Sequence, residues 1–278
     1  MLNLDAKPEV FVKGFQAPEG PSFNRDGHLF FVDCEAGVIY RVARNRKVEV
    51  FVETGGRPTG TKFHRDERLF VCDSVRGLIT VDPDGNISVL ASEYEGKGLQ
   101  GPNDLTISPQ GNVYFTDPGD SSLENPTGNV YLYRADGSLE LFDGGYALPN
   151  GAAIGPDGKT LYMAETYTRR IYRFALGEDG RRKNCDLFFQ LEGGLGPDGM
   201  AFDVEGNLYV AHWGKGCVAV LEAKGALLGE LPTIGMQPTN VAFWNEALYV
   251  TEMEKGQVVR IEIGVSGLEV YGLSKSAQ

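Results

Sequence analysis

The chain has 278 residues, a length that a toroidal all-β fold can reach as one domain. Its formal net charge of −12 argues against nucleic acid and anionic membrane as partners, because both require basic patches. An apolar content of 42% allows a sizeable core, and the acidic surplus fits either plain solubility or an acidic mouth that attracts cations.

The N-terminal segment, Met1 to Val12, has no apolar stretch or cleavage-like site of a secretory signal. No run along the chain approaches 18 apolar residues, so we expect no membrane-spanning helix and a cytoplasmic protein. The cysteines are widely spaced and form no CxxC pair, which predicts buried thiols in a reducing compartment and leaves a stray disulfide open. These cysteines are Cys34, Cys72, Cys185 and Cys217.

Six segments that begin with proline and lead into a short strand recur along the chain. The residues after the proline lie at positions 19, 59, 103, 150, 198 and 239, with steps of 40, 44, 47, 48 and 41 residues. A repeat of this period is typical of an array or a propeller. The segments are Pro18-Glu19-Gly20, Pro58-Thr59-Gly60, Pro102-Asn103-Asp104, Pro149-Asn150-Gly151, Pro197-Asp198-Gly199 and Pro238-Thr239-Asn240.

Each repeat continues with a short strand, a polar turn, a strand such as 28–33 or 112–117, a third strand after glycine and a more polar fourth strand. These runs are rich in β-branched and aromatic residues, with turn signals every 8–12 residues or so, and we find no convincing amphipathic helix. The pattern predicts one all-β domain over residues 1–278, a six-bladed β-propeller of four-stranded antiparallel blades around a central channel. An open solenoid would need capping repeats, and none is visible.

An extra strand at one end of the chain is expected to complete the last blade. Both Val10 to Val12 and Leu268 to Tyr271 resemble a fourth strand without a repeat of their own, and the sequence does not choose between them. The insert from Gly119 to Thr127 is expected to form a surface loop.

The second position of the six segments always carries an oxygen-bearing side chain, and a propeller would bring all six near one mouth of its channel. A structural role explains Thr59 and Thr239, because small polar side chains can contact the water of the channel. Glu19 and Asp198 do not, because two carboxylates in a narrow channel repel each other unless a cation or a shared proton intervenes. The amides of Asn103 and Asn150 would complete an oxygen-only set, which predicts one divalent ion, Ca²⁺ first, with Mg²⁺, Mn²⁺ or Zn²⁺ as alternatives.

Acidic residues at the end of the second strand recur in nearly every repeat, which favours a role in the fold such as bonding turn backbone. His212 takes this position in the fifth repeat, and we expect a structural hydrogen bond there rather than a role near the cavity. The acids are Asp33, Asp73, Asp117, Glu165 and Glu252.

The combination of these motifs resembles the senescence-marker-protein/gluconolactonase family over essentially the whole chain. The resemblance implies a six-bladed propeller with one divalent ion, usually calcium, at the channel mouth. It implies Glu19, Asn150 and Asp198 as ligands, with Asn103 at or beside the metal. We expect Asn103 to hold the ion or a substrate hydroxyl. It also implies that Asp198 handles the proton of the attacking water. Motifs that carry the resemblance are Glu19-Gly20-Pro21, Pro102-Asn103-Asp104, Tyr114 to Pro118, Leu148 to Gly151, Thr160 to Thr166 and Gly196 to Met200.

The sequence departs from this family at one position. The animal gluconolactonase branch has an arginine two residues before the asparagine of the third repeat, and this chain has Gly101 there. Arg57, Tyr167 and Arg169 are expected near channel-facing turns and could substitute.

The function that follows is a metal-dependent lactonase acting on a small-molecule lactone, with sugar lactones prominent among the family's substrates. Hydrolysis of phosphoric or phosphonic esters and fluorides on the same site is an alternative, because related propellers with a similar ligand set catalyse it. A non-catalytic calcium-binding propeller is the third hypothesis.

Overall fold

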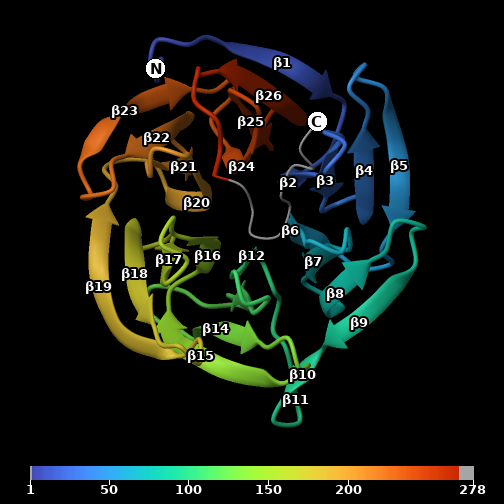
Figure 1. Cartoon of the computed structure of the whole chain (residues 1–278), viewed down its shortest axis with the longest axis vertical. Coiled ribbons are helices and arrows are strands. Elements are labelled where there is room, and N and C mark those ends of the chain that lie inside the picture. The colour runs from blue at the N-terminus through green and yellow to red at the C-terminus, as the bar shows by residue number, and fades with distance from the viewer. Residues whose placement is uncertain (1, 269–278) are drawn as a thin grey trace.

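Each sequence repeat folds into one antiparallel sheet because its short β-branched and aromatic runs are separated by tight polar turns (Figure 1). The computed structural model describes residues 2–268 and arranges six such four-stranded sheets around a central channel. The first strand of each repeat faces the channel, and the last strand lies at the rim. The predicted six-bladed β-propeller is therefore confirmed.

Blades one to three contain the first half of the repeats. Blade one consists of β2 (Pro18–Phe23), β3 (Leu29–Asp33), β4 (Val38–Val42) and β5 (Val48–Glu53). Blade two consists of β6 (Pro58–Phe63), β7 (Leu69–Asp73), β8 (Gly77–Val81) and β9 (Ile87–Ala91). Blade three consists of β12 (Leu105–Ile107), β13 (Val113–Asp117), β14 (Gly128–Tyr133) and β15 (Leu139–Tyr146).

Blades four to six complete the ring. Blade four consists of β16 (Pro149–Ile154), β17 (Thr160–Glu165), β18 (Arg170–Leu176) and β19 (Arg182–Gln190). Blade five consists of β20 (Gly196–Phe202), β21 (Leu208–Trp213), β22 (Cys217–Leu221) and β23 (Leu227–Pro232). Blade six consists of β24 (Pro238–Trp244), β25 (Ala247–Glu252), β26 (Gln257–Glu262) and β1 (Pro8–Lys13).

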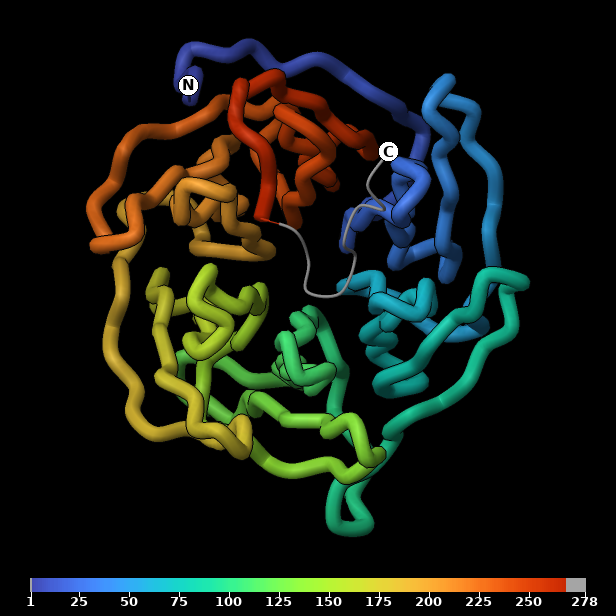
Figure 2. The backbone as a smooth tube through the Cα atoms, in the orientation of Figure 1, coloured from blue at the N-terminus to red at the C-terminus, as the bar shows by residue number. Residues whose placement is uncertain are grey.

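The N-terminal strand closes the ring (Figure 2). β1 pairs antiparallel with β26, from Pro8 opposite Ile261 to Lys13 opposite Gln257. Of the two candidate closing segments, Val10 to Val12 is the one that completes blade six. The other begins at Leu268, whose amide donates to the carbonyl oxygen of Phe202 in blade five at 2.8 Å, and its residues 269–271 lie outside the described part of the chain.

The core lies between neighbouring blades, because each sheet buries both of its faces. Strand β3 is buried at every position, and Val32 and Ile39 of blade one pack against Val71 and Ile79 of blade two. The rim strand β5 is only half-buried. Burial of this apolar surface is the main force that holds the blades in a ring.

Close approach of the inner strands depends on glycine at the third position of the repeated segments. A Cβ on Gly151 would lie 2.1 Å from the carbonyl oxygen of Asp198, and one on Gly199 would lie 2.0 Å from the side chain of Asn240. Side chains cannot occupy such spaces, so glycine lets adjacent blades bring their second positions close to the channel axis.

Two features were not anticipated from the sequence. A two-stranded hairpin, β10 (Glu93–Tyr94) with β11 (Lys97–Gly98), projects from the rim between blades two and three (Figure 1). Cys185 is exposed, which corrects the expectation of a buried thiol, because it lies on an outward position of the rim strand β19. The other three cysteines are buried, and all four are free.

Two sequence expectations agree with the structure. Within the insert from Gly119 to Thr127, residues 122–127 are mostly exposed, whereas Ser121 is buried and accepts a hydrogen bond from the Leu148 amide at 3.0 Å. Residues 2–268 form no helix, and therefore none long and apolar enough to cross a membrane.

Candidate metal centre in the channel

Acids at the ends of the second strands hold the loops that lead into the inner strands. Asp33 accepts hydrogen bonds from the backbone amides of Gln16 and Ala17 at 2.8 and 3.0 Å, and Glu252 accepts one from Gln237 at 2.9 Å. Equivalent bonds are made by the other acids of this set, Asp73, Asp117 and Glu165. Their expected role in the fold is therefore observed, and it fixes where each inner strand begins.

The two threonines of the second position join neighbouring blades. The Thr59 hydroxyl lies 3.0 Å from the carbonyl oxygens of Cys72 in its own blade and Pro102 in the next. The Thr239 hydroxyl lies 3.0 Å from the carbonyl oxygen of Pro18, across the closure between blades six and one. Both side chains are buried and hydrogen-bonded to backbone carbonyl oxygens, as expected for residues with a structural role.

Glu19 on β2, Asn150 on β16 and Asp198 on β20 each follow the proline of their repeated segment and meet at the same end of the channel. Their exposed fractions are only 6%, 6% and 8%. Burial and then the negative charge of Asp104 raise the pKa of Glu19 to about 8. Burial and then the charges of Glu19 and Asp104 raise the pKa of Asp198 well above its usual range, and hydrogen bonds from the Gly199 backbone and the Asn150 side chain oppose this rise. These mutual effects show that carboxyls from separate blades share one poorly solvated volume.

Two oxygens of this group lack partners. The Oε2 atom of Glu19 and the Oδ1 atom of Asn150 are buried and accept no hydrogen bond from the described residues. Buried acceptors of this kind are rare, because leaving one unsatisfied costs about 1–3 kcal/mol. An oxygen-preferring divalent cation would satisfy both and would neutralise the two carboxylates, so the residues present fit such an ion.

Asp104 and Asn240 belong to the same group, although the sequence analysis did not select them. The Asp104 carboxylate is buried and accepts hydrogen bonds from the amides of Leu105 at 2.8 Å and Ala152 at 3.2 Å. The Asn240 side chain lies beside Glu19 and Asp104 and lowers both pKa values. The third position of the repeated segments is glycine in the other four repeats. The departure from glycine at Asp104 and Asn240 is the sequence feature that could have identified them.

Lys62 is a third residue that the sequence analysis missed. It lies on β6, is 8% exposed and takes the fifth position of the repeated proline segments, where the other repeats have Ser, Thr or Ala. Burial raises the pKa of Asp104, and the positive charge of Lys62 opposes that rise. The sequence feature that could have identified Lys62 is a charged residue at a position where the other repeats have small side chains.

Asn103 is placed less clearly than the other three predicted residues. It precedes β12, is half-buried, and its backbone bonds to Thr116 and Gly60 at 2.9 and 2.6 Å. Within residues 2–268 its side chain makes no hydrogen bond. The structure thus puts Asn103 at the start of the channel segment of blade three without showing a contact to Glu19 or Asp198.

The structure explains the glycine at position 101. Gly101 has a φ of 151°, which is strained for a residue with a side chain, and its amide donates to Asp117 at 2.6 Å. An arginine at this position would therefore be unfavourable. Of the three candidate substitutes, Arg57 forms an ion pair with Glu35 at 2.8 Å, and Arg169 lines a separate surface hollow next to Gly193. Tyr167 is half-buried.

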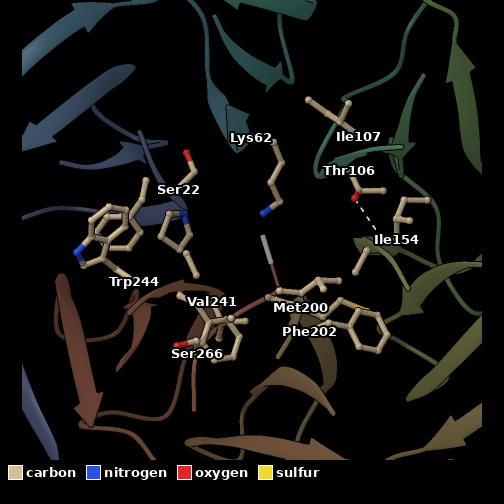
Figure 3. A pocket seen from close by; sticks show the side chains of 18 of the residues that line it. Ser22, Lys62, Thr106, Ile107, Ile154, Met200, Phe202, Val241, Trp244 and Ser266 are labelled. Atoms are coloured by element: carbon tan, nitrogen blue, oxygen red, sulfur yellow. Dashed lines mark hydrogen bonds between the residues drawn. The ribbon is translucent and has the colours of Figure 1, made fainter. Parts of the chain in front are cut away.

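The opposite end of the channel is apolar. A cavity of about 300 Å³ lies between the C-terminal halves of the inner strands, lined by side chains such as Ile154, Met200, Phe202 and Val241 (Figure 3). The Lys62 side chain reaches into this cavity from β6. The channel is therefore polarised, with the acids at one end and apolar side chains at the other.

Comparisons with known proteins point to one family. A family model described as the SMP-30/gluconolactonase/LRE-like region matches residues 17–254. Lactonase drp35 of Staphylococcus aureus is 31% identical over 247 residues, which cover 83% of this chain and 74% of that protein. The diisopropyl-fluorophosphatase of Loligo vulgaris is 29% identical over 217 residues, 70% of this chain and 68% of that protein. A solved gluconolactonase structure from Xanthomonas campestris has a TM-score of 0.83 at 28% identity, covering 93% of this chain and 90% of the other.

Proposed function

This chain belongs to the SMP-30/gluconolactonase/LRE-like family, and we propose that it is a divalent-metal-dependent hydrolase that opens lactones, with sugar lactones as the first candidates. The observation that carries the proposal is the buried group of Glu19, Asn150 and Asp198, with two acceptor oxygens that have no partner. Relatives described as lactonase and gluconolactonase support a reaction of this class.

Glu19, Asn150 and Asp198 would hold one divalent ion, with Asn103 beside it. Carboxylate and amide oxygens favour Ca²⁺, which accepts six to eight oxygen ligands, so positions remain for water and substrate. When bound, such an ion supplies Lewis-acid polarisation of a carbonyl oxygen. Asp104 and Lys62 carry opposite charges, so together they add no net charge to the group formed by Glu19, Asn150 and Asp198.

Asp198 would act as the general base of the reaction. Its carboxylate takes a proton from the attacking water as the water oxygen bonds to the lactone carbonyl carbon. The ring C–O bond then breaks, and the same proton returns to the departing alkoxide, so the product is a hydroxy acid. Asn103 would hold a substrate hydroxyl or the ion.

A lactone panel tests this function directly. Purified protein, stripped with chelator and then reloaded with Ca²⁺, Mn²⁺ or Zn²⁺, should open aldonolactones and aliphatic lactones only when reloaded. Asp198→Asn should bind the ion more weakly and lose turnover even at saturating metal. Turnover that survives exhaustive chelation would contradict the metal role, and full turnover in Asp198→Asn would contradict the base role.

Hydrolysis of phosphoric esters or fluorides is the second candidate. The match to the diisopropyl-fluorophosphatase of Loligo vulgaris favours it, because a polarised P=O group could occupy the same position as a lactone carbonyl. Assaying diisopropyl fluorophosphate beside the lactones under identical metal loading separates the two activities. Tight calcium binding without turnover of either substrate would instead favour the non-catalytic calcium-binding propeller.

A further inference from the structure

Blade five carries a cluster of nitrogen, sulfur and oxygen donors away from the channel acids. His212 is the second-last residue of β21, Cys217 begins β22 as its cross-strand partner, and Glu230 on β23 lies opposite Ala219. Residues two apart on a strand share a face, so all three side chains lie on one face of the sheet. A ring nitrogen of His212, the Cys217 sulfur and a carboxylate oxygen of Glu230 all lie within 4.8 Å of one another.

The hydrogen bond of His212 determines its tautomer. Its Nε2 atom lies 2.9 Å from the carbonyl oxygen of Gly193, and a carbonyl can only accept, so Nε2 carries the hydrogen. The Nδ1 atom therefore holds a lone pair. His212 is 0% exposed, and this Nδ1 has no hydrogen-bond partner among residues 2–268. A buried acceptor without a donor is costly unless something else binds it.

We propose that His212, Cys217 and Glu230 form a second metal site, for a thiophilic divalent ion such as Zn²⁺. Imidazole, thiolate and carboxylate are the three ligand types that Zn²⁺ prefers, and three protein ligands leave a fourth position for water. The Gly193 carbonyl supplies the outer hydrogen bond that typically orients a metal-binding histidine. This donor set differs from the oxygen-only set of the channel, so the two sites select different ions.

Two competing interactions must change when the ion binds. The Lys215 ammonium lies 2.6 Å from a Glu230 oxygen, but Lys215 is on a turn with 35% of its side chain exposed, so it can move into solvent. Burial and the nearby Glu230 charge raise the pKa of Cys217 to about 12, so the thiol is protonated without an ion. Binding therefore releases the thiol proton to solvent and forms the metal–sulfur bond in its place.

Cobalt is the probe that separates this site from the channel. Co²⁺ bound to a thiolate shows a charge-transfer band in the near ultraviolet, which oxygen ligands do not produce. With the full chain saturated with Ca²⁺, added Co²⁺ should produce this band at one ion per chain, and Zn²⁺ should displace it. Absence of the band in the wild-type protein would overturn the proposal.

Matched variants identify the ligands. Cys217→Ser should abolish the band and weaken Zn²⁺ binding by at least about 10-fold, while Cys185→Ser, which removes the exposed thiol, should change neither. His212→Gln retains a donor for Gly193 but loses Nδ1 and should weaken binding in the same way. Lys215→Met should tighten binding, because it removes the ammonium that competes for Glu230. An unchanged band in Cys217→Ser, or weaker binding in Lys215→Met, would contradict the assignment.

Discussion

Calcium binding in the channel should strengthen steeply as the pH rises, because the cation competes with a proton for the buried carboxyl of Glu19. Burial and the charge of Asp104 raise the pKa of this group from its usual 4.5 to about 8. About 1% of Glu19 is therefore ionised at pH 6 and about 90% at pH 9. Glu19 alone should make the measured affinity about 100-fold weaker at pH 6 than at pH 9. The raised pKa of Asp198 acts in the same direction.

The stability of the calcium-free protein should change with pH in the opposite sense. Between about pH 4.5 and pH 8, folded Glu19 keeps a proton that the unfolded chain has lost, so unfolding releases a proton. The free energy of unfolding therefore falls as the pH rises through this window. Saturating calcium should restore it, because the ion binds the folded chain and offsets the buried charges.

Isothermal titration calorimetry from pH 6 to pH 9 checks this prediction. Two buffers with different heats of ionisation report the protons released, and we expect about one or more per calcium at pH 7. Thermal unfolding with and without calcium provides the stability curves. Glu205→Gln, an exposed change in the turn after β20, should leave the profile unaltered. Equal calcium affinity at pH 6 and pH 9 would refute the reasoning, because Glu19 would then be ionised throughout.

Three substitutions probe the inner strands. Asp198→Asn should lower lactone turnover about 10²- to 10⁴-fold in a rate assay at saturating metal. It should also stabilise the metal-free protein, because it removes a buried acid. A destabilised metal-free variant would count against the burial of Asp198 as an unfavourable acid. Thr239→Val should cost about 1–3 kcal/mol in urea unfolding by removing its bond to Pro18, with calcium affinity unchanged; a loss of affinity would instead make Thr239 part of the site. Gly151→Ala should destabilise the fold by more than about 1 kcal/mol and weaken calcium binding, because its Cβ would lie 2.1 Å from a backbone oxygen. Gly98→Ala is the control and should be neutral, because the nearest atom to its Cβ lies at 4.0 Å.

Periodicity along the chain was sufficient to predict the propeller, and it placed Glu19, Asn150 and Asp198 at equivalent positions of different blades. The interval between the proline segments reports the length of one blade, and the inner strand of each blade faces the same channel. Residues at one register position must therefore lie near one end, as Glu19, Asn150 and Asp198 do. The roles of the strand-end acids also followed, because those side chains bond to backbone within their own repeat.

Tertiary structure alone decided the features that depend on contacts between blades. Asp104 and Lys62 act on Glu19 from blades three and two, and no spacing within one repeat reveals which charges face each other across the channel. The choice of β1 as the closing strand likewise required the two ends of the ring to meet. Local pattern determined what each blade is, because strands and turns form from neighbouring residues. Charge, burial and close approach at the axis were set by the ring, because they arise between residues that are distant in sequence.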